Sequence, residues 1–168
     1  LTHRSTAARK RTAMIDYQRL FHTGVLVPDL DQAMDELGVS LGVTWAEAQA
    51  SAAQRVWTSD GGAHTLPLRF TYSCEGPQHI ELLEGPADSI WDGQTNPGVH
   101  HQGIWVDDVA TETRRFLDTG WELRLSQLSP DEGFGAYTYL QPPTGVLVEF
   151  VASAMIPRFE RWWAGGTL

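Results

Sequence analysis

The sequence predicts an α+β fold in which two tandem βαβββ modules form an open, cupped mixed sheet. Three observations support this prediction. A short pattern of residues occurs twice, at 21–30 and 100–109. A stretch with helical spacing follows each copy, and each half of the chain ends in an apolar run that contains one glutamate. Each half is therefore predicted to form a strand, a helix and three further strands.

The two copies of the pattern place the same residue types at the same positions. Residues 21–30 are Phe-His-Thr-Gly-Val-Leu-Val-Pro-Asp-Leu, and residues 100–109 are His-His-Gln-Gly-Ile-Trp-Val-Asp-Asp-Val. Alignment pairs His22 with His101, Gly24 with Gly103, Val25 with Ile104, Val27 with Val106 and Asp29 with Asp108. Each copy is predicted as the first strand of its module, and its last aspartate is predicted as the N-cap of the next helix.

The remaining elements are predicted from spacing and composition. The first predicted helix shows helical spacing at Leu30, Ala33, Met34 and Leu37. The second shows it at Val109, Thr113, Phe116 and Leu117. Gly38 and Gly120 are predicted to end these two helices. The middle strands are predicted at 53–58, 66–73, 122–128 and 135–140, and the final strands at 79–83 and 146–151.

Composition limits the class of protein. The chain has 168 residues, of which 42% are hydrophobic and 20% are charged, and this excludes wholesale disorder. It contains no apolar run of about 18 residues, so no membrane span is predicted. The net charge of −9 argues against nucleic acid as the main partner. The single cysteine, Cys74, cannot form an internal disulfide, and we expect a reducing, cytoplasmic location.

Three segments are predicted along the chain. Residues 1–13 are basic and precede Met14, so we expect a disordered leader or a remnant of cloning. Residues 14–155 are predicted as a single domain. Its two modules span 14–86 and 97–155. Residues 156–168, which contain Pro-Arg-Phe-Glu-Arg-Trp-Trp at 157–163, are predicted as a C-terminal docking segment. A dimer contact and a lid over the site are alternative roles for it.

Four polar side chains stand at matching positions of the two modules. His22 and His101 lie in the first strands, and Glu81 and Glu149 lie inside the final apolar strands. If the modules pair about a pseudo-twofold axis, these four side chains, here called the tetrad, meet on one concave face. Two imidazoles and two carboxylates suit an octahedral divalent ion such as Ni, Co, Mn, Fe or Zn. Taken singly, each glutamate could instead lie on an edge strand in water, and each histidine could be a hydrogen-bonded core residue.

These motifs resemble the vicinal oxygen chelate superfamily, which includes glyoxalase I, methylmalonyl-CoA epimerase, extradiol dioxygenases and bleomycin-resistance proteins. The resemblance covers about residues 15–155 and is strongest for methylmalonyl-CoA epimerase. The shared motifs are His22 with Val27-Pro28-Asp29-Leu30, Gly98-Val99-His100-His101 with Val106-Asp107-Asp108, and Gly-Val-Leu-Val-Glu at 145–149. The resemblance implies a glyoxalase-like fold around a divalent metal ion. It implies as ligands His22, Glu81, His101 and Glu149.

The sequence departs from the epimerase pattern at a position that bears on catalysis. The epimerases carry a second glutamate, on a middle strand of the first half, as the partner of the metal-bound base. No glutamate is found there, and Glu47 lies too early in the chain. His64 lies nearer that place, in a predicted loop, and is a candidate acid or base, although a loop histidine can simply be solvated. His100 is predicted to face away from the site beside the ligand His101.

Aromatic residues are predicted to line a pocket beside the metal. Strand alternation places several of them on inward faces, and the predicted lining consists of Trp105, Phe70, Tyr72, Tyr137 and Tyr139. An aromatic wall suits a bulky or aromatic small-molecule substrate. The same side chains could instead fill the core between the sheet and the helices.

The sequence therefore predicts a metal-dependent isomerase, epimerase or lyase that removes a proton next to a carbonyl group. Glu149, Glu81 and His64 are the candidate catalytic residues. The alternative is a small-molecule binding or sequestration protein of the bleomycin-resistance type, although such proteins typically lack the tetrad. An Fe(II) ring-cleaving dioxygenase is a further alternative, and Glu81 argues against its site of two histidines and one glutamate. The resemblance also implies a homodimer.

Overall fold

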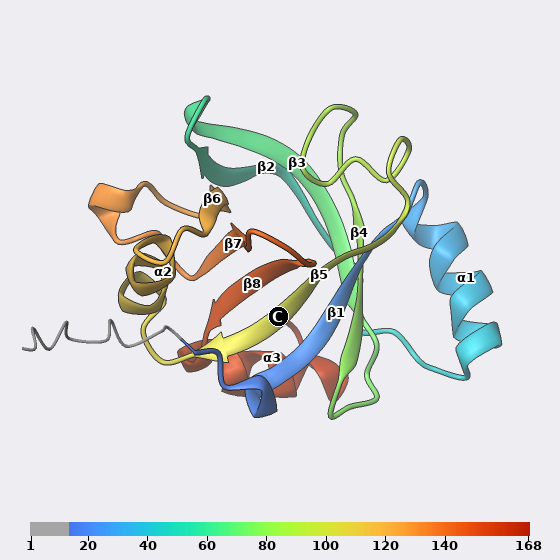
Figure 1. The fold of residues 1–168 in the computed structure, drawn as a ribbon. Helices are drawn as coiled ribbons and strands as arrows, with labels where there is room; N and C mark the ends of the chain where they lie inside the picture. Colours follow the sequence, from blue (N-terminus) through green and yellow to red (C-terminus); the bar gives the residue numbers. More distant parts are fainter. Residues whose placement is uncertain (1–13) are drawn as a thin grey trace, which may run out of the picture.

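Residues 14–168, the part of the chain that the computed structural model describes, form eight strands, three α-helices and three short 3-10 helices (Figure 1). The strands are β1 (Leu20–Leu26), β2 (Gln49–Thr58), β3 (Gly62–Tyr72), β4 (His79–Glu84), β5 (Gly98–Val106), β6 (Glu122–Ser126), β7 (Tyr137–Gln141) and β8 (Leu147–Ala152). The helices are α1 (Leu30–Leu41), α2 (Val109–Leu117) and α3 (Ile156–Trp163), with 3-10 helices at Tyr17–Arg19, Pro130–Glu132 and Ser153–Met155. The predicted leader, residues 1–13, lies outside the described residues.

The order of elements repeats a βαβββ module. The first half contains β1, α1, β2, β3 and β4, and the second contains β5, α2, β6, β7 and β8. The sheet order is β1-β4-β3-β2 in the first half and β5-β8-β7-β6 in the second. In each half the first and last strands are parallel, and the halves join through the antiparallel pair β1–β5. The predicted α+β fold, with two tandem modules and a cupped mixed sheet, is confirmed.

The sequence predicts an open sheet, whereas the sheet of the structure closes into a barrel. Closure depends on a single residue pair, Trp57 of β2 with Ser126 of β6, so this side is the narrow seam of the barrel. Both strands are predicted from the sequence. Their pairing depends on how strongly the sheet coils, which the alternation of side chains along one strand does not encode.

The module helices begin where the repeated aspartates predict. The Asp29 carboxylate accepts a hydrogen bond of 2.9 Å from the backbone N–H of Gln32, and the Asp108 carboxylate accepts one of 2.9 Å from that of Thr111. The end of α2 also lies close to its predicted stop. The helix ends at Leu117, and Gly120 follows in the left-handed conformation with φ of 94°.

The predicted end of α1 at Gly38 is wrong. The helix continues to Leu41, and Gly42, whose φ of 66° is left-handed, is its C-cap. A Cβ on Gly38 would lie 3.0 Å from the indole nitrogen of Trp45, so this glycine serves close packing and not termination. The opposite end of α1 is fixed on the sheet, because Leu30 is fully buried in a cluster with Leu82 of β4.

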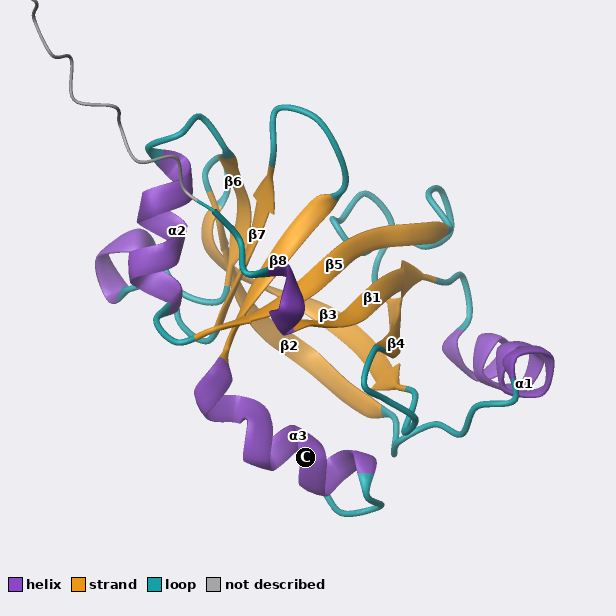
Figure 2. Ribbon diagram, turned by 60° about the horizontal axis from the view of Figure 1, so that its bottom comes forward, coloured by secondary structure: helices purple, strands orange, loops and turns teal. Residues whose placement is uncertain are grey.

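The helices lie on different sides of the barrel. α1 and α2 flank the sheet, while α3 lies across one end of it (Figure 2). Phe159 and Trp162 of α3 are buried, and the Phe159 ring lies 5.5 Å from the ring of Tyr72. The Trp162 indole donates a hydrogen bond of 3.0 Å to the backbone carbonyl of Glu47. No helix within residues 14–168 is long and apolar enough to cross a membrane.

Candidate metal centre

The tetrad lies on four neighbouring strands, in the order β4, β1, β5 and β8. Two rows of paired residues run across these strands, and each row has a glycine at its centre. In the first row Gly24 is paired with Glu81 and His101. In the second row Gly103 is paired with Glu149 and His22. Exchange of the two modules converts one row into the other. Each module therefore supplies one imidazole and one carboxylate to the same point, as the repeat predicts.

The central glycines allow the imidazoles to cross the sheet. A Cβ on Gly24 would collide with the ring of His101, and a Cβ on Gly103 would collide with the ring of His22. Each ring thus lies directly over the glycine of the other module. Any larger residue at either position would displace a tetrad histidine, which explains why the repeat carries glycine two residues after each histidine.

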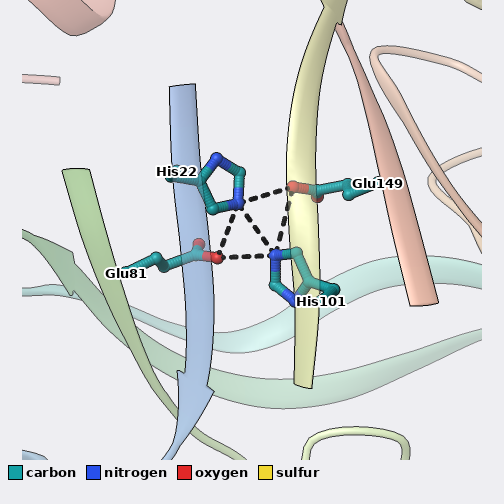
Figure 3. Close-up of side chains that lie close together, drawn as sticks. All are labelled: His22, Glu81, His101 and Glu149. Carbon is teal, nitrogen blue, oxygen red and sulfur yellow. Dashed lines mark hydrogen bonds and ion pairs between the residues drawn. The ribbon is translucent and has the colours of Figure 1, made fainter. Parts of the chain in front are cut away.

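The four side chains converge on one small volume (Figure 3). The Nε2 atoms of His22 and His101 are 2.8 Å apart. Glu81 Oε2 lies 3.1 Å from His101 Nε2 and 3.3 Å from His22 Nε2. Glu149 Oε2 lies 3.2 Å from His22 Nε2 and 3.5 Å from His101 Nε2. All four atoms lie within 4.8 Å of one another.

These separations fit a bound divalent ion. Ligand atoms about 2.1 Å from one ion lie about 3.0 Å apart at right angles and about 3.4 Å apart in a tetrahedron. All four side chains are buried, and among the described residues no hydrogen bond of good geometry reaches Glu81 Oε2 or Glu149 Oε2. Buried carboxylate oxygens without donors are costly. The donor set and its orphaned oxygens are therefore those of a cluster that could hold a metal.

The same cluster shifts the pKa values of its members. Burial alone would raise the pKa of Glu81, but contacts with the imidazoles of His101 and His22 lower it to about 2. The pKa of Glu149 is lowered for the same reasons. Burial alone would lower the pKa of His101, but its contacts with Glu149 and Glu81 raise it to about 9, and the pKa of His22 is raised likewise. In the absence of a metal, protons on the imidazoles therefore neutralise the buried carboxylates.

His100 contacts the tetrad from behind. Its Nδ1 lies 2.9 Å from Nδ1 of His101, on the side of that ring away from the other tetrad atoms. Burial lowers the pKa of His100, and the charge of His101 lowers it further, to about 4. A neutral His100 can accept a hydrogen bond from the Nδ1–H of His101, which leaves the Nε2 lone pair of His101 for a metal.

A cavity of about 170 Å³ opens beside the tetrad. Glu81 and Glu149 line it, whereas His22 and His101 do not. Four of the aromatic residues predicted from strand alternation also line it, and these are Phe70, Tyr72, Tyr137 and Tyr139. The carboxylates are therefore the side of the tetrad that a bound small molecule would meet.

The prediction that Trp105 lines this pocket is wrong. Trp105 does lie on the inward face of its strand, but it is buried beneath α3. Its indole stacks on Phe21 at 3.6 Å and meets Phe159 of α3 edge to face at 5.5 Å. The helix covers this part of the inward face, so the ring belongs to a core cluster and not to the cavity wall.

The structure places His64, the candidate acid or base, away from the tetrad. His64 lies near the start of β3 and contacts the backbone carbonyl of Gly62 at 2.9 Å. Tyr72, which lies beside the tetrad, is at the other end of the same strand, roughly 25 Å away at the usual rise per residue. His64 instead lines a separate surface hollow with Asp60. A loop was expected here, and the early start of β3 fixes the side chain far from the cavity.

Several residues that line the cavity escape sequence-based prediction. Met155, Arg158 and Phe159 of the C-terminal segment line it, as does Gln54 of β2. The spacing of the first three residues places them on one helical face, which is a signal that the sequence contains. The sequence does not reveal that α3 packs across the end of the barrel. Without that information, the sequence cannot show which part of the protein this helical face contacts.

The fold and its tetrad define a barrel of paired βαβββ modules with a candidate metal centre at the junction of the modules. Residues 21–139 match the model of the Glyoxalase/Bleomycin resistance protein/Dioxygenase superfamily. The chain belongs to this superfamily. The matched segment ends before Glu149 and α3. The family match therefore says nothing about these two features, and their positions come from the structure alone. No curated protein matches the sequence significantly.

Solved structures with the same fold include two from bacteria that cover most of this chain. A hypothetical protein from Bacillus halodurans is 21% identical with a TM-score of 0.58, over 80% of this chain and 93% of its own. A variant of Streptomyces coelicolor methylmalonyl-CoA epimerase in complex with 2-nitronate-propionyl-CoA is 24% identical with a TM-score of 0.57, over 81% of this chain and 94% of its own. At this identity the likeness shows the fold.

Proposed function

We propose that the protein is a metal-dependent isomerase or lyase that removes a proton from the carbon next to a carbonyl group. One observation carries this proposal. Two buried carboxylates meet two buried imidazoles at a point within 4.8 Å, and the carboxylates alone of the four also line a cavity. The site thus combines a candidate cation-binding cluster with carboxylate bases that a small molecule can reach.

His22, Glu81, His101 and Glu149 would hold the metal. A divalent ion bound there would polarise a carbonyl oxygen and would stabilise the negative charge that develops on it when the neighbouring proton leaves. The contribution of the chain is to orient the four donors through the paired rows of β4, β1, β5 and β8. The mostly apolar wall lowers the local dielectric, which strengthens electrostatic interactions beside the tetrad.

A carboxylate of the tetrad would take the proton. Within the described residues, the other titratable groups that line the cavity are the tyrosines and Arg158. Burial raises the pKa values of Tyr72, Tyr137 and Tyr139 above their usual range, so these phenols stay protonated. Arginine is always protonated. Glu149 and Glu81 are therefore the bases at the cavity wall. They occupy equivalent positions in the two modules.

The substrate is proposed to be a small molecule with an acidic C–H bond beside its carbonyl. The epimerase structure to which the fold is similar holds a CoA ester analogue. The aromatic cavity by itself would also suit a binding protein that sequesters a small molecule, which is the second candidate function. The two candidates differ in one respect, because only the enzyme exchanges a substrate proton with solvent.

Proton exchange in deuterated water tests the proposal. Metal-loaded protein would be incubated with methylmalonyl-CoA, with the hemithioacetal of methylglyoxal and glutathione, and with hydroxyacetone, and exchange would be followed by NMR. We expect exchange with at least one of them, a fall of about 100-fold or more in Glu149→Gln or Glu81→Gln, and no change in Glu122→Gln. Glu122 is an exposed strand residue outside the cavity.

Two results would argue against this function. Binding without exchange for every compound would favour sequestration. Proton exchange that is unchanged in both tetrad variants would show that neither carboxylate is the base. Consumption of oxygen with a catechol would instead indicate a ring-cleaving dioxygenase.

A further inference from the structure

One face of α3 forms part of the cavity wall. Arg158 and Phe159 of α3 line the cavity together with Met155, the residue directly before the helix, at the spacing that puts side chains on one side of a helix. The helix is held in place, because Trp162 is fully buried and its indole hydrogen-bonds the backbone carbonyl of Glu47 at 3.0 Å. Arg158 is therefore held at the cavity by a fixed element of the fold.

The Arg158 guanidinium has no partner among residues 14–168. No ion pair or hydrogen bond joins it to another described side chain, although four other arginines form such ion pairs, namely Arg19, Arg55, Arg69 and Arg115. Arg161 lies on the same helix and is also exposed and without an ion pair in that range, but it does not line the cavity. An arginine cannot shed its proton in a protein. A permanent positive charge thus stands at this cavity without a counter-charge of its own.

The charge balance of the cavity favours an anion. A divalent ion held by two carboxylates and two neutral imidazoles would leave the tetrad without net charge. The lining tyrosines are neutral near pH 7, because the ordinary pKa of a phenol is about 10. The other side chains that line the cavity among residues 14–168 are neutral and mostly apolar, so Arg158, whose side chain is exposed, is the lining side chain whose charge is not balanced.

The volume of the cavity limits the body of the ligand. An apolar cavity of about 150 Å³ holds a benzene molecule, and the cavity beside the tetrad measures about 170 Å³. Aromatic rings such as Phe70 and Tyr139 form its walls and suit contact with another ring. A single ring or a branched group of similar size fills this space.

We propose that Arg158 is a specificity-determining residue that binds a carboxylate of the substrate. The substrate is then a carbonyl compound with a ring-sized apolar body, whose carbonyl end faces Glu81 and Glu149 and whose carboxylate, at the opposite end, pairs with Arg158. Guanidinium and carboxylate form paired, charge-assisted hydrogen bonds, which fix orientation as well as affinity. This inference rests on the proposed function, because that function places the carbonyl group at the tetrad.

Equilibrium binding of a matched pair of compounds tests the inference. The probes are para-acetylbenzoate, which carries a carboxylate opposite its ketone, and para-methylacetophenone, which has the same shape without the charge. Binding to the full chain loaded with zinc is measured by calorimetry. We expect the carboxylate to bind about 10-fold or more tightly than its neutral analogue, and Arg158→Gln to remove this preference. Arg158→Lys retains the charge and should retain part of the preference.

Arg161→Gln is the matched control, because it removes the same charge from the same helix away from the cavity. An equal loss of preference in Arg161→Gln would overturn the inference, since the effect would then be one of overall charge. A wild-type protein that does not prefer para-acetylbenzoate, or whose preference survives Arg158→Gln, would overturn it as well. Arg158 is exposed, so its variants are expected to fold, and circular dichroism checks this.

The same samples separate this inference from the proposed function. Exchange of the acetyl protons in deuterated water is measured beside binding. A preference that depends on Arg158, without exchange of any test compound, would contradict the proposed function and support the carboxylate site. Exchange of both ketones at equal affinity would support the proposed function and overturn the carboxylate site.

Discussion

Metal binding by the tetrad should release protons, and the structure gives their number. Without a metal, the contacts of His101 with Glu149 and Glu81 outweigh the effect of burial and raise its pKa to about 9, and the pKa of His22 is also raised. A metal binds only neutral imidazole. At neutral pH each ion that enters must therefore displace the proton of His101, and the raised pKa of His22 favours the release of a second proton.

The pH dependence follows from this stoichiometry. Release of one proton makes the affinity rise about 10-fold for each pH unit, and release of two protons makes it rise about 100-fold. We expect a slope between these limits near neutral pH, which falls once His101 loses its proton above about 9. The carboxylates do not contribute in this range, because the pKa of Glu81 lies at about 2 and that of Glu149 is lowered as well.

The same pKa shifts should make the free energy of unfolding of the metal-free protein depend on pH. The pKa of His101 is raised from 6.5 to about 9, so its stabilising effect is complete below 6.5 and disappears as the pH rises through 9. The pKa of Glu81 is lowered from 4.5 to about 2, so its effect is present above 4.5 and disappears as the pH falls toward 2. We therefore expect the free energy of unfolding to be largest between these two windows.

Calorimetry measures the released protons directly. Chelator-treated protein is titrated with zinc in buffers that differ in ionisation enthalpy, and the dependence of the measured heat on the buffer gives the number of protons. His64→Ala is a suitable control, because His64 lies in a separate surface hollow. Zinc binding without proton release, or with an affinity that does not change between about pH 6 and 8, would refute the reasoning.

Three further variants test separate parts of the structure. Gly103→Ala places a Cβ against the ring of His22, so we expect about 1–3 kcal/mol of destabilisation and a large loss of zinc affinity, and unchanged calorimetric binding would contradict the row geometry. His100→Ala removes the acceptor at 2.9 Å from His101 Nδ1 and should weaken zinc binding about 10- to 100-fold while the thermal transition stays near that of the wild type. Trp162→Ala empties a fully buried site, so chemical denaturation should show a loss of about 3–5 kcal/mol, and a loss below about 1 kcal/mol would show that α3 is only loosely attached.

The position of the tetrad could be predicted from the sequence because it depends on local patterns. Alternation along a strand puts His22 and Gly24 on one face, and the repeat puts His101 and Gly103 at equivalent places. Two modules that pair by their first strands must then bring the histidines together, as the pair β1–β5 does. The aspartate caps were predictable for the same reason, since an N-cap involves residues close in sequence.

Features that depend on packing between distant segments could not be predicted in this way. Trp105 faces inward as alternation predicts, but only the position of α3 decides that Phe159 covers it. Glycine often ends a helix, but Gly38 lies inside α1, where close packing against Trp45 requires a residue without a side chain. Arg158 lies at the cavity through the same docking of α3, which no local pattern specifies.

The most direct test of the account is the metal content of tag-free protein, measured by elemental analysis beside the variants Glu149→Gln and Glu122→Gln. We expect about one divalent ion per chain in the wild type and in Glu122→Gln, and little or none in Glu149→Gln. A wild-type protein that holds no metal, and takes up none when Ni, Co, Mn, Fe or Zn is added, would contradict it. The buried carboxylates of the tetrad would then be neutralised by protons on the imidazoles alone.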